Sequence, residues 1–280
     1  MIRIDAHQHF WRLDRGDYGW LTPALAPIYR DFGPGDLAPE LANAGIDRTI
    51  LVQAAPTIAE TRFMLEIAAR TPFVAGVVGW ADFAAPDAAE VIADLAADPL
   101  LVGLRPMIHD IDDPEWMLLP ALAPAFTALK EHGLVFDALV KPPHLAPLLT
   151  LAQRYPDLPI VIDHGAKPLI SVGLLDPWRD GMAALAALPN VACKLSGLVT
   201  EAGPEWSVER LRPYTDHLIT AFGPTRLLFG SDWPVCTLAA SYRAWIEAAE
   251  ALTAHLTVAE GAAIFGGNAE RIYLTSRGRK

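Results

Sequence analysis

Two histidines one residue apart, His7 and His9, stand near the N-terminus in the segment "DAHQHFW". Side chains alternate between the two faces of a strand, so a strand ending here would point both imidazoles the same way. Further along, His164 follows the apolar run "PIVID", and Asp232 follows "RLLFGS". Imidazole and carboxylate groups at one point suit a divalent metal such as Zn²⁺, and they also suit proton transfer. The chemistry therefore depends on whether the fold brings these four residues together.

The composition is that of an acidic, folded protein. The chain has 280 residues, of which 52% are hydrophobic and 20% are charged, and this is enough for one large core. The net charge of -11, without a basic cluster, argues against binding to nucleic acid or to an anionic membrane. We see neither a signal peptide nor a transmembrane run, so we expect a cytoplasmic protein. The oligomeric state is not indicated.

A rhythm of strand and helix repeats eight times along the chain. The predicted strands are mostly continuous Val, Ile and Leu runs, which is typical of strands buried on both faces. They cover residues 2–6, 48–54, 73–80, 100–106, 134–140, 159–165, 190–197 and 226–232. The predicted helices cover residues 36–44, 58–70, 86–97, 120–132, 144–155, 177–187, 207–222, 238–254 and 258–273. Eight such units favour a single α/β domain over residues 1–280, a (β/α)8 TIM barrel with C-terminal helices.

The main alternative fold is a doubly wound open sheet. That fold would place a glycine-rich phosphate loop after the first strand, where this chain has "DAHQHFW". The barrel is therefore the better prediction. The final segment "TSRGRK" is expected to be a frayed tail.

In a (β/α)8 barrel, active-site residues come from the carboxyl ends of the strands and from the loops that follow them. Polar and aromatic residues at the predicted strand ends are thus candidates for substrate binding. They are Trp11, Asp82, Arg105, His109, Trp116, Asp137, Lys141, Lys167 and Trp233. One polar residue at a strand end is more often a loop cap, so the prediction rests on their conjunction at one barrel mouth.

The ordered set of a His-x-His after strand 1, a His after strand 6 and an Asp after strand 8 resembles the amidohydrolase superfamily. The segments "GLRPMIHDIDDPEWML", "FDALVKPPHL", "VIDHGAKP", "CKLSGLVTEA" and "FGSDWPVC" are similar to its sugar-lactone hydrolase branch, which includes L-fuconolactone and L-rhamnonolactone hydrolases. The resemblance covers essentially the whole chain. It implies an enzyme that hydrolyses a sugar lactone, a small cyclic ester, to the open-chain acid.

One departure from the metal-dependent members of this superfamily concerns the expected metal site. Those members carry a carboxylated Lys or a Glu at strand 4, or a His at strand 5, where this chain has Arg105 and Asp137. A guanidinium has no lone pair to offer a metal, so a binuclear site is not expected. A single ion, with Zn²⁺ as first choice, stays open, and its ligands would be His7, His9, His164 and Asp232. The resemblance implies that this branch binds a metal weakly or does without one.

Lactone hydrolysis needs a polarised carbonyl, an activated water and a proton for the leaving alkoxide. We expect Asp232 to be the general base, as the resemblance implies. The residues His7, His9 and His164 would polarise the carbonyl, directly or through an ion. Arg105 and Lys167 would stabilise the oxyanion, unless they form structural ion pairs with Asp137 or Asp163.

Aromatic side chains are expected to form the wall that faces the sugar, because indole rings pack on the C–H faces of sugars. Six of the eight tryptophans fall in or beside the loops at the predicted mouth: Trp11, Trp20, Trp80, Trp116, Trp206 and Trp233. Two or three of them should touch the ligand. Cys193 and Cys236 are expected to be buried free thiols, because this set of His and Asp needs no covalent nucleophile.

Five other functions stay open. The same residues could isomerise a lactone, or hydrolyse a lactone from aromatic degradation. A metal-dependent decarboxylase or amide hydrolase could use the same barrel. A non-catalytic carbohydrate-binding barrel is the alternative from another class, and it is the one that the ring of His and Asp argues against.

Overall fold

The computed structural model describes residues 2–275, and it is a parallel barrel of eight strands in the order β1 to β8. The strands are β1 Ile4–Gln8, β2 Arg48–Val52, β3 Val74–Gly79, β4 Leu101–Leu104, β5 Val135–Ala138, β6 Ile160–Ile162, β7 Val191–Leu195 and β8 Leu227–Phe229. A parallel bridge between Gln8 and Trp233 joins the chain beyond β8 to β1, and the His9 amide donates to the Trp233 carbonyl at 2.7 Å. The predicted (β/α)8 barrel is confirmed.

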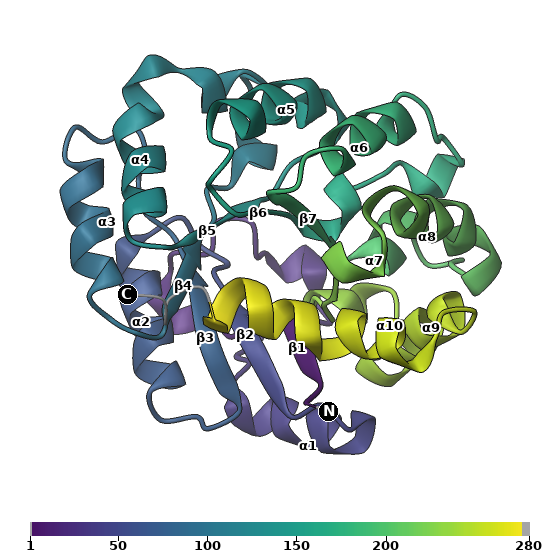
Figure 1. Ribbon diagram of the computed structural model, residues 1–280. Helices are drawn as coiled ribbons and strands as arrows, with labels where there is room; N and C mark the ends of the chain where they lie inside the picture. The colour runs from purple at the N-terminus through teal and green to yellow at the C-terminus, as the bar shows by residue number, and fades with distance from the viewer. Residues whose placement is uncertain (1, 276–280) are drawn as a thin grey trace.

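Helices surround the strands, as Figure 1 shows. They are α1 Pro34–Ala44, α2 Ile58–Ala68, α3 Ala88–Ala96, α4 Ala123–Glu131, α5 Leu145–Arg154, α6 Trp178–Ala186, α7 Leu198–Ala202, α8 Val208–Phe222, α9 Tyr242–Thr253 and α10 Val258–Ala262. The short helix α7 was not predicted. The last predicted helix, residues 258–273, is α10 followed by two wider π-helical segments, Ala263–Gly267 and Glu270–Thr275.

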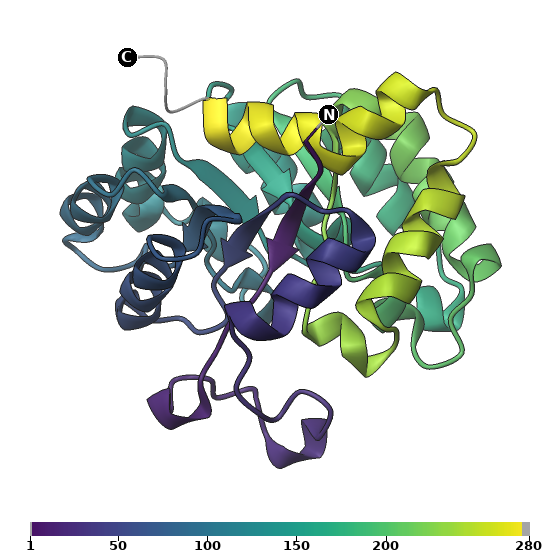
Figure 2. The same cartoon turned by 90° about the horizontal axis from the view of Figure 1, so that it is seen from below.

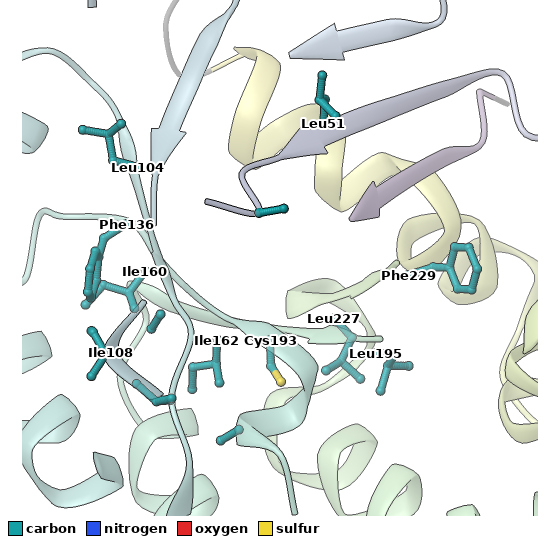
Figure 3. Close-up of a cluster of buried hydrophobic side chains, with 14 of the residues drawn as sticks. Leu51, Leu104, Ile108, Phe136, Ile160, Ile162, Cys193, Leu195, Leu227 and Phe229 are labelled. Atoms are coloured by element: carbon teal, nitrogen blue, oxygen red, sulfur yellow. The ribbon is translucent and has the colours of Figure 1, made fainter. Parts of the chain in front are cut away.

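Two apolar layers hold the barrel together. The outer layer lies between strands and helices, where Figure 3 shows Leu104, Phe136 and Ile162 among its members. The inner layer fills the barrel and is built largely of branched side chains, as is usual for this fold. It contains Ile4, Ala6, Ile50, Val52, Val78, Val102, Val135, Val161, Ala192 and Leu228, joined by Ala269 and Tyr273 of the C-terminal segment.

The two ends of the barrel are covered differently (Figure 2). The C-terminal segment packs across the end where the strands begin, and Tyr273 is completely buried there. The loop between β1 and α1 projects from the opposite end. Its base is fixed by paired backbone hydrogen bonds between Trp11 and Phe32, and the Trp20 indole donates to the Ala54 carbonyl at 2.7 Å. The carboxyl ends of the strands are thus the end that can receive a ligand.

Two sequence expectations concern the C-terminal tail and membrane-spanning segments. Most of the tail predicted to fray, residues 276–280, lies outside the described residues. Within residues 2–275, no helix combines the length and apolar character needed to cross a membrane.

Candidate active site

The strands β6 and β8 are shorter than predicted: they end at Ile162 and Phe229. His164 and Asp232, which the predicted strands include, lie beyond them in left-handed turns. His164 has φ 53° and Asp232 has φ 58°. A non-glycine residue in this region costs about 1–3 kcal/mol and persists only where its surroundings hold it. The Asp232 amide donates to the His7 carbonyl at 2.8 Å, and this bond ties the turn after β8 to β1. These turns aim both side chains at the barrel mouth.

Gly197, the residue directly before α7, makes room for one of these side chains. Its φ is +63°, and a Cβ atom built there would lie 2.6 Å from the His164 ring nitrogen Nδ1. A side chain at this position would therefore push against the His164 ring.

The pairing register of β1 with β2 shifts between Asp5 and Gln8. Ile4 and Ala6 face the barrel interior, yet His7 also reaches the interior, where it contacts Lys194. An irregular pair with one extra residue redirects side chains in this way. The strand thus delivers His7 and His9 to the same place, as the sequence predicted.

Asp232 is the point at which the four predicted residues meet. Its Oδ1 lies 3.3 Å from His9 Nε2 and 3.7 Å from His7 Nε2. The same oxygen lies 3.8 Å from His164 Nε2. All four side chains are nearly or completely buried, so these charges and dipoles act on one another with little screening by water.

Hydrogen bonds fix the orientation of two rings. His9 Nδ1 donates to the Val52 carbonyl at 2.7 Å, and this turns Nε2 toward Asp232 Oδ1. His164 Nδ1 lies 2.9 Å from Ser196 Oγ, which leaves its Nε2 on the cavity side. Histidines that bind metals are commonly oriented through the other ring nitrogen in this manner.

The donor atoms fit a divalent ion. His7, His9 and Asp232 place one ligand atom each within 4.8 Å of one another, and so do His7, Asp163 and His164. In a tetrahedral zinc site with bonds of about 2.0–2.1 Å, neighbouring ligand atoms stand about 3.3–3.4 Å apart. The separation of 3.3 Å between His9 Nε2 and Asp232 Oδ1 matches this value.

The ionisation states favour a base beside neutral imidazoles. Burial opposes ionisation of Asp232, but His164, His9 and Lys167 together hold its pKa below the ordinary value. Burial lowers the pKa of His7 and of His164 well below the usual range, although nearby carboxylates act in the opposite direction. Asp232 is therefore ionised at neutral pH, while His7 and His164 are uncharged.

Beneath this site lies a buried charged group, the floor cluster, formed by Asp137, Asp163, Lys194 and Tyr273. Lys194 Nζ lies 2.5 Å from Asp137 Oδ2 and 3.0 Å from Asp163 Oδ1. Tyr273 donates its hydroxyl to Asp137 at 2.8 Å. Burial raises the pKa of Asp137 to about 6 against the pull of Lys194. For Asp163 burial acts the same way, but Lys194, His7 and Arg105 outweigh it and hold the pKa well below its usual range.

A cavity of about 290 Å³ opens above the four residues. It is lined by His9, Trp20, Leu25, Ala54, Arg105, Met107, His109, Asp110, Leu139, His164, Lys167, Asp232, Val235 and Leu238. A second cavity of about 690 Å³ shares His109 and Lys167 with it, and Lys141 and Glu201 belong to its wall. Burial, followed by Lys167 and Arg105, lowers the pKa of His109 to about 3, so this ring is neutral.

Three predicted substrate-binding residues line the first cavity: Arg105, His109 and Lys167. Lys141 lies beside it, with its ammonium donating to the His109 carbonyl at 2.8 Å. Both cations, Arg105 and Lys167, form ion pairs, which were the alternative to a role at the oxyanion. Arg105 pairs with Asp163 at 3.1 Å, while Lys167 pairs with Glu201 at 2.8 Å.

Five other predicted substrate contacts lie away from the cavity wall. The Asp137 carboxylate is sealed in the floor cluster, and the Trp11 indole is buried and donates to the Arg30 carbonyl. Trp233 packs edge-on against Phe32, and Trp116 packs on the outer apolar layer. Asp82 is exposed and accepts the Ala84 amide of its own loop. In each case packing or a local hydrogen bond occupies the side chain.

Sequence reasoning named Asp163 only as a possible ion-pair partner of a cation, and it assigned no role to Lys194, Ser196 or Gln53. The signal for the first two was their position, because Asp163 and Lys194 interrupt otherwise apolar strand runs, as Asp137 does. A charged residue in such a run needs a partner inside the barrel. Gln53 gives a weaker signal, since its role depends on the Arg105 carbonyl, to which it donates at 2.7 Å.

Full-length similarity to known proteins agrees with this geometry. The chain is 50% identical to L-fucono-1,5-lactonase from Burkholderia ambifaria over 99% of this chain and 97% of the relative. It is 37% identical to L-fucono-1,5-lactonase from Burkholderia multivorans, over 97% of this chain and 96% of the relative.

Two crystal structures of an amidohydrolase from Burkholderia multivorans, one with bound HEPES and one with bound zinc, superpose with TM-scores of 0.90 and 0.91. Each is 38% identical to this chain, and each comparison covers 98% of this chain and 99% of the other. The family model described as Amidohydrolase matches residues 4–274. With its His and Asp residues gathered at the mouth of a (β/α)8 barrel, this chain belongs to the amidohydrolase family.

Proposed function

We propose that this chain is a lactonase that hydrolyses a sugar lactone, with L-fucono-1,5-lactone as the first substrate to test. The observation that carries the proposal is the full-length similarity to two L-fucono-1,5-lactonases in a chain whose candidate residues His9, His164 and Asp232 line one cavity. The fold alone would not support it, because many activities share this barrel.

Asp232 is the general base in this proposal. Its carboxylate is ionised, lies at the cavity and has Oδ1 3.3 Å from His9 Nε2. A water held between Asp232 and the lactone carbonyl would give its proton to the carboxylate as the new C–O bond forms. The proton would then go to the ring oxygen as the ester bond breaks, so that the acid leaves in open-chain form.

Cations at the cavity wall stabilise the negative charge that develops on the carbonyl oxygen. Arg105 and Lys167 both line the cavity, and each is already held by a carboxylate. Fixed donors of this kind contribute about 3–4 kcal/mol each in other enzymes. Trp20 and Leu25 give the same cavity an apolar wall suited to the C–H face of a sugar ring.

A divalent ion, with zinc as first choice, would be held by Asp232 and His9, with His164 beside them. When bound it would supply a Lewis acid for the carbonyl. The orientation of His9 through the Val52 carbonyl supports such a site. In line with the sequence expectation, we propose that hydrolysis does not require the ion.

The direct test is turnover of the purified protein on a panel of 1,4- and 1,5-lactones of aldonic acids, followed by acid release with a pH indicator. We expect the largest kcat/KM for L-fucono-1,5-lactone, with and without chelator. Carbon NMR of the product separates the open-chain acid from a migrated lactone, which a lactone isomerase would give. Rates no higher than spontaneous hydrolysis across the panel would refute the proposal.

A further inference from the structure

The guanidinium of Arg105 is locked in place beside the candidate metal ligands. Its side chain is almost completely buried, and Nη1 donates to Asp163 Oδ2 at 3.1 Å. Its Nη2 donates to the carbonyl of Gln53, whose own side chain donates back to the Arg105 carbonyl at 2.7 Å. Two bonds hold the guanidinium and a third holds the backbone of the same residue, so the side chain does not swing out of the site.

The same Nη1 lies 3.3 Å from His7 Nε2. Arginine donates and never accepts, so a hydrogen bond in this contact requires His7 Nε2 to accept. The other ring nitrogen, Nδ1, lies 3.3 Å from Asp163 Oδ1 and 3.2 Å from Lys194 Nζ. Lys194 is already paired with Asp137 and Asp163, and we assign the Nδ1 proton to the Asp163 carboxylate, which leaves Nε2 as the acceptor. An aromatic ring nitrogen has one lone pair, and here the guanidinium already uses it.

This contact matters because, within residues 2–275, both groups that could hold a metal contain His7. With His7 engaged by Arg105, each group is left with two ligands. Asp163, in the second group, is also paired with both Arg105 and Lys194. In addition, Arg105 carries a permanent positive charge, which would repel a divalent cation bound at His7 Nε2, only 3.3 Å from Nη1.

We propose that Arg105 is a built-in competitor of the metal: it withholds His7 from a divalent ion and keeps the metal affinity of this site low. The metal that reaches the site then rests mainly on His9 and Asp232. This inference deepens the proposed lactonase site and rests on that proposal for the site's location. Its test measures metal binding in the absence of lactone, so it can fail while lactone hydrolysis stands.

The experiment measures Zn²⁺ affinity by competition with a chromophoric chelator at pH 7.5, using the full-length chain. Arg105→Met keeps most of the side-chain length but removes the charge and the donors. We expect it to bind Zn²⁺ at least about 10-fold more tightly than the wild type, since it frees one imidazole ligand. Arg105→Lys keeps the charge and should gain clearly less. Arg62→Met, at an exposed ion pair on α2, removes the same charge elsewhere and should leave the affinity unchanged.

A second substitution tests the role of His7 directly. In the wild type, His7→Asn should change Zn²⁺ affinity by less than about 3-fold, whereas in the Arg105→Met background it should abolish the gain. His9→Asn should weaken binding in both backgrounds. Loss of affinity on His7→Asn in the wild type, or no gain on Arg105→Met in a protein with native circular dichroism, would overturn the inference. If Arg105→Met does not fold, the wild-type comparison of His7→Asn with His9→Asn still decides it.

Discussion

The barrel contains two buried groups of ionisable residues, one above the other, and they have opposite characters. The rim cluster, which we define as His9, His164 and Asp232, faces the cavity. The floor cluster lies below it and is completely buried, with Lys194 held between two carboxylates. His7 touches both clusters, through Asp232 on one side and Lys194 on the other.

The difference lies in what each cluster leaves available. In the floor cluster, Lys194 lies between two carboxylates, and Tyr273 donates its hydroxyl to the Asp137 oxygen that Lys194 does not bind. In the rim cluster, ring nitrogens and a carboxylate oxygen point at one another across 3.3–3.8 Å beside a cavity, and two of the three residues have left-handed backbone. Strained backbone and polar atoms that can still bind a ligand, both beside a cavity, are typical of a functional site. Buried charges that are paired with one another are typical of structural support.

The comparison is tested most severely by Asp232→Asn. We expect kcat for lactone hydrolysis to fall at least about 100-fold, because the general base is lost. Folding should be nearly unchanged, since asparagine tolerates left-handed backbone better than most residues. Asp94→Asn, at an exposed ion pair on α3, is the matched control and should keep full activity. Turnover near the wild-type value in Asp232→Asn would remove Asp232 from its role.

Lys194→Met tests the floor cluster. It leaves Asp137 and Asp163 in one buried site without their shared cation, and breaking a buried pair in this way costs about 3–5 kcal/mol. We expect that loss in the free energy of unfolding measured with urea. Lys130→Met, at an exposed position on α4, should change it little. A variant as stable as the wild type would show that the floor cluster contributes no structural support.

Gly197→Ala should displace the His164 ring of the rim cluster while leaving every ionisable group of the cluster in place. The added methyl group would meet the His164 ring at 2.6 Å and would also force alanine into left-handed backbone. We expect about a 10-fold loss of kcat, because small misplacements of catalytic groups are costly. Gly173→Ala, where φ is +69° but open space surrounds the site, separates the backbone effect from the clash. Equal activity losses in the two variants would contradict this explanation.

Tyr273→Phe is the mildest change. It removes one hydroxyl donor to Asp137, so we expect a loss of about 1 kcal/mol in stability and unchanged kcat. Thermal unfolding should show a shift of about 2–4 °C. Tyr29→Phe, at a partly exposed position in the first loop, is the control. A large fall in kcat would mean that the floor cluster participates in the reaction.

Much of this protein was determined by local sequence. Eight apolar runs separated by helical patterns predicted the barrel, because strands buried on both faces need apolar residues throughout. The placement of His7, His9, His164 and Asp232 at predicted strand ends was enough to expect their convergence, since the strand ends of a barrel meet at one rim. Those predictions needed only periodicity and topology.

Other features were decided by tertiary structure alone. Asp137, Trp11 and Trp233 also stand at strand ends, but their partners come from distant segments, and the sequence does not say whether a side chain finds the cavity or a neighbour. The register shift in β1 and the left-handed turns at His164 and Asp232 depend on contacts between β1 and the chain beyond β8. The contact between Arg105 and His7 joins residues 98 positions apart. The sequence by itself therefore determined which groups are placed near the barrel mouth. Three-dimensional packing decided which of them line the cavity and which are held by neighbouring side chains.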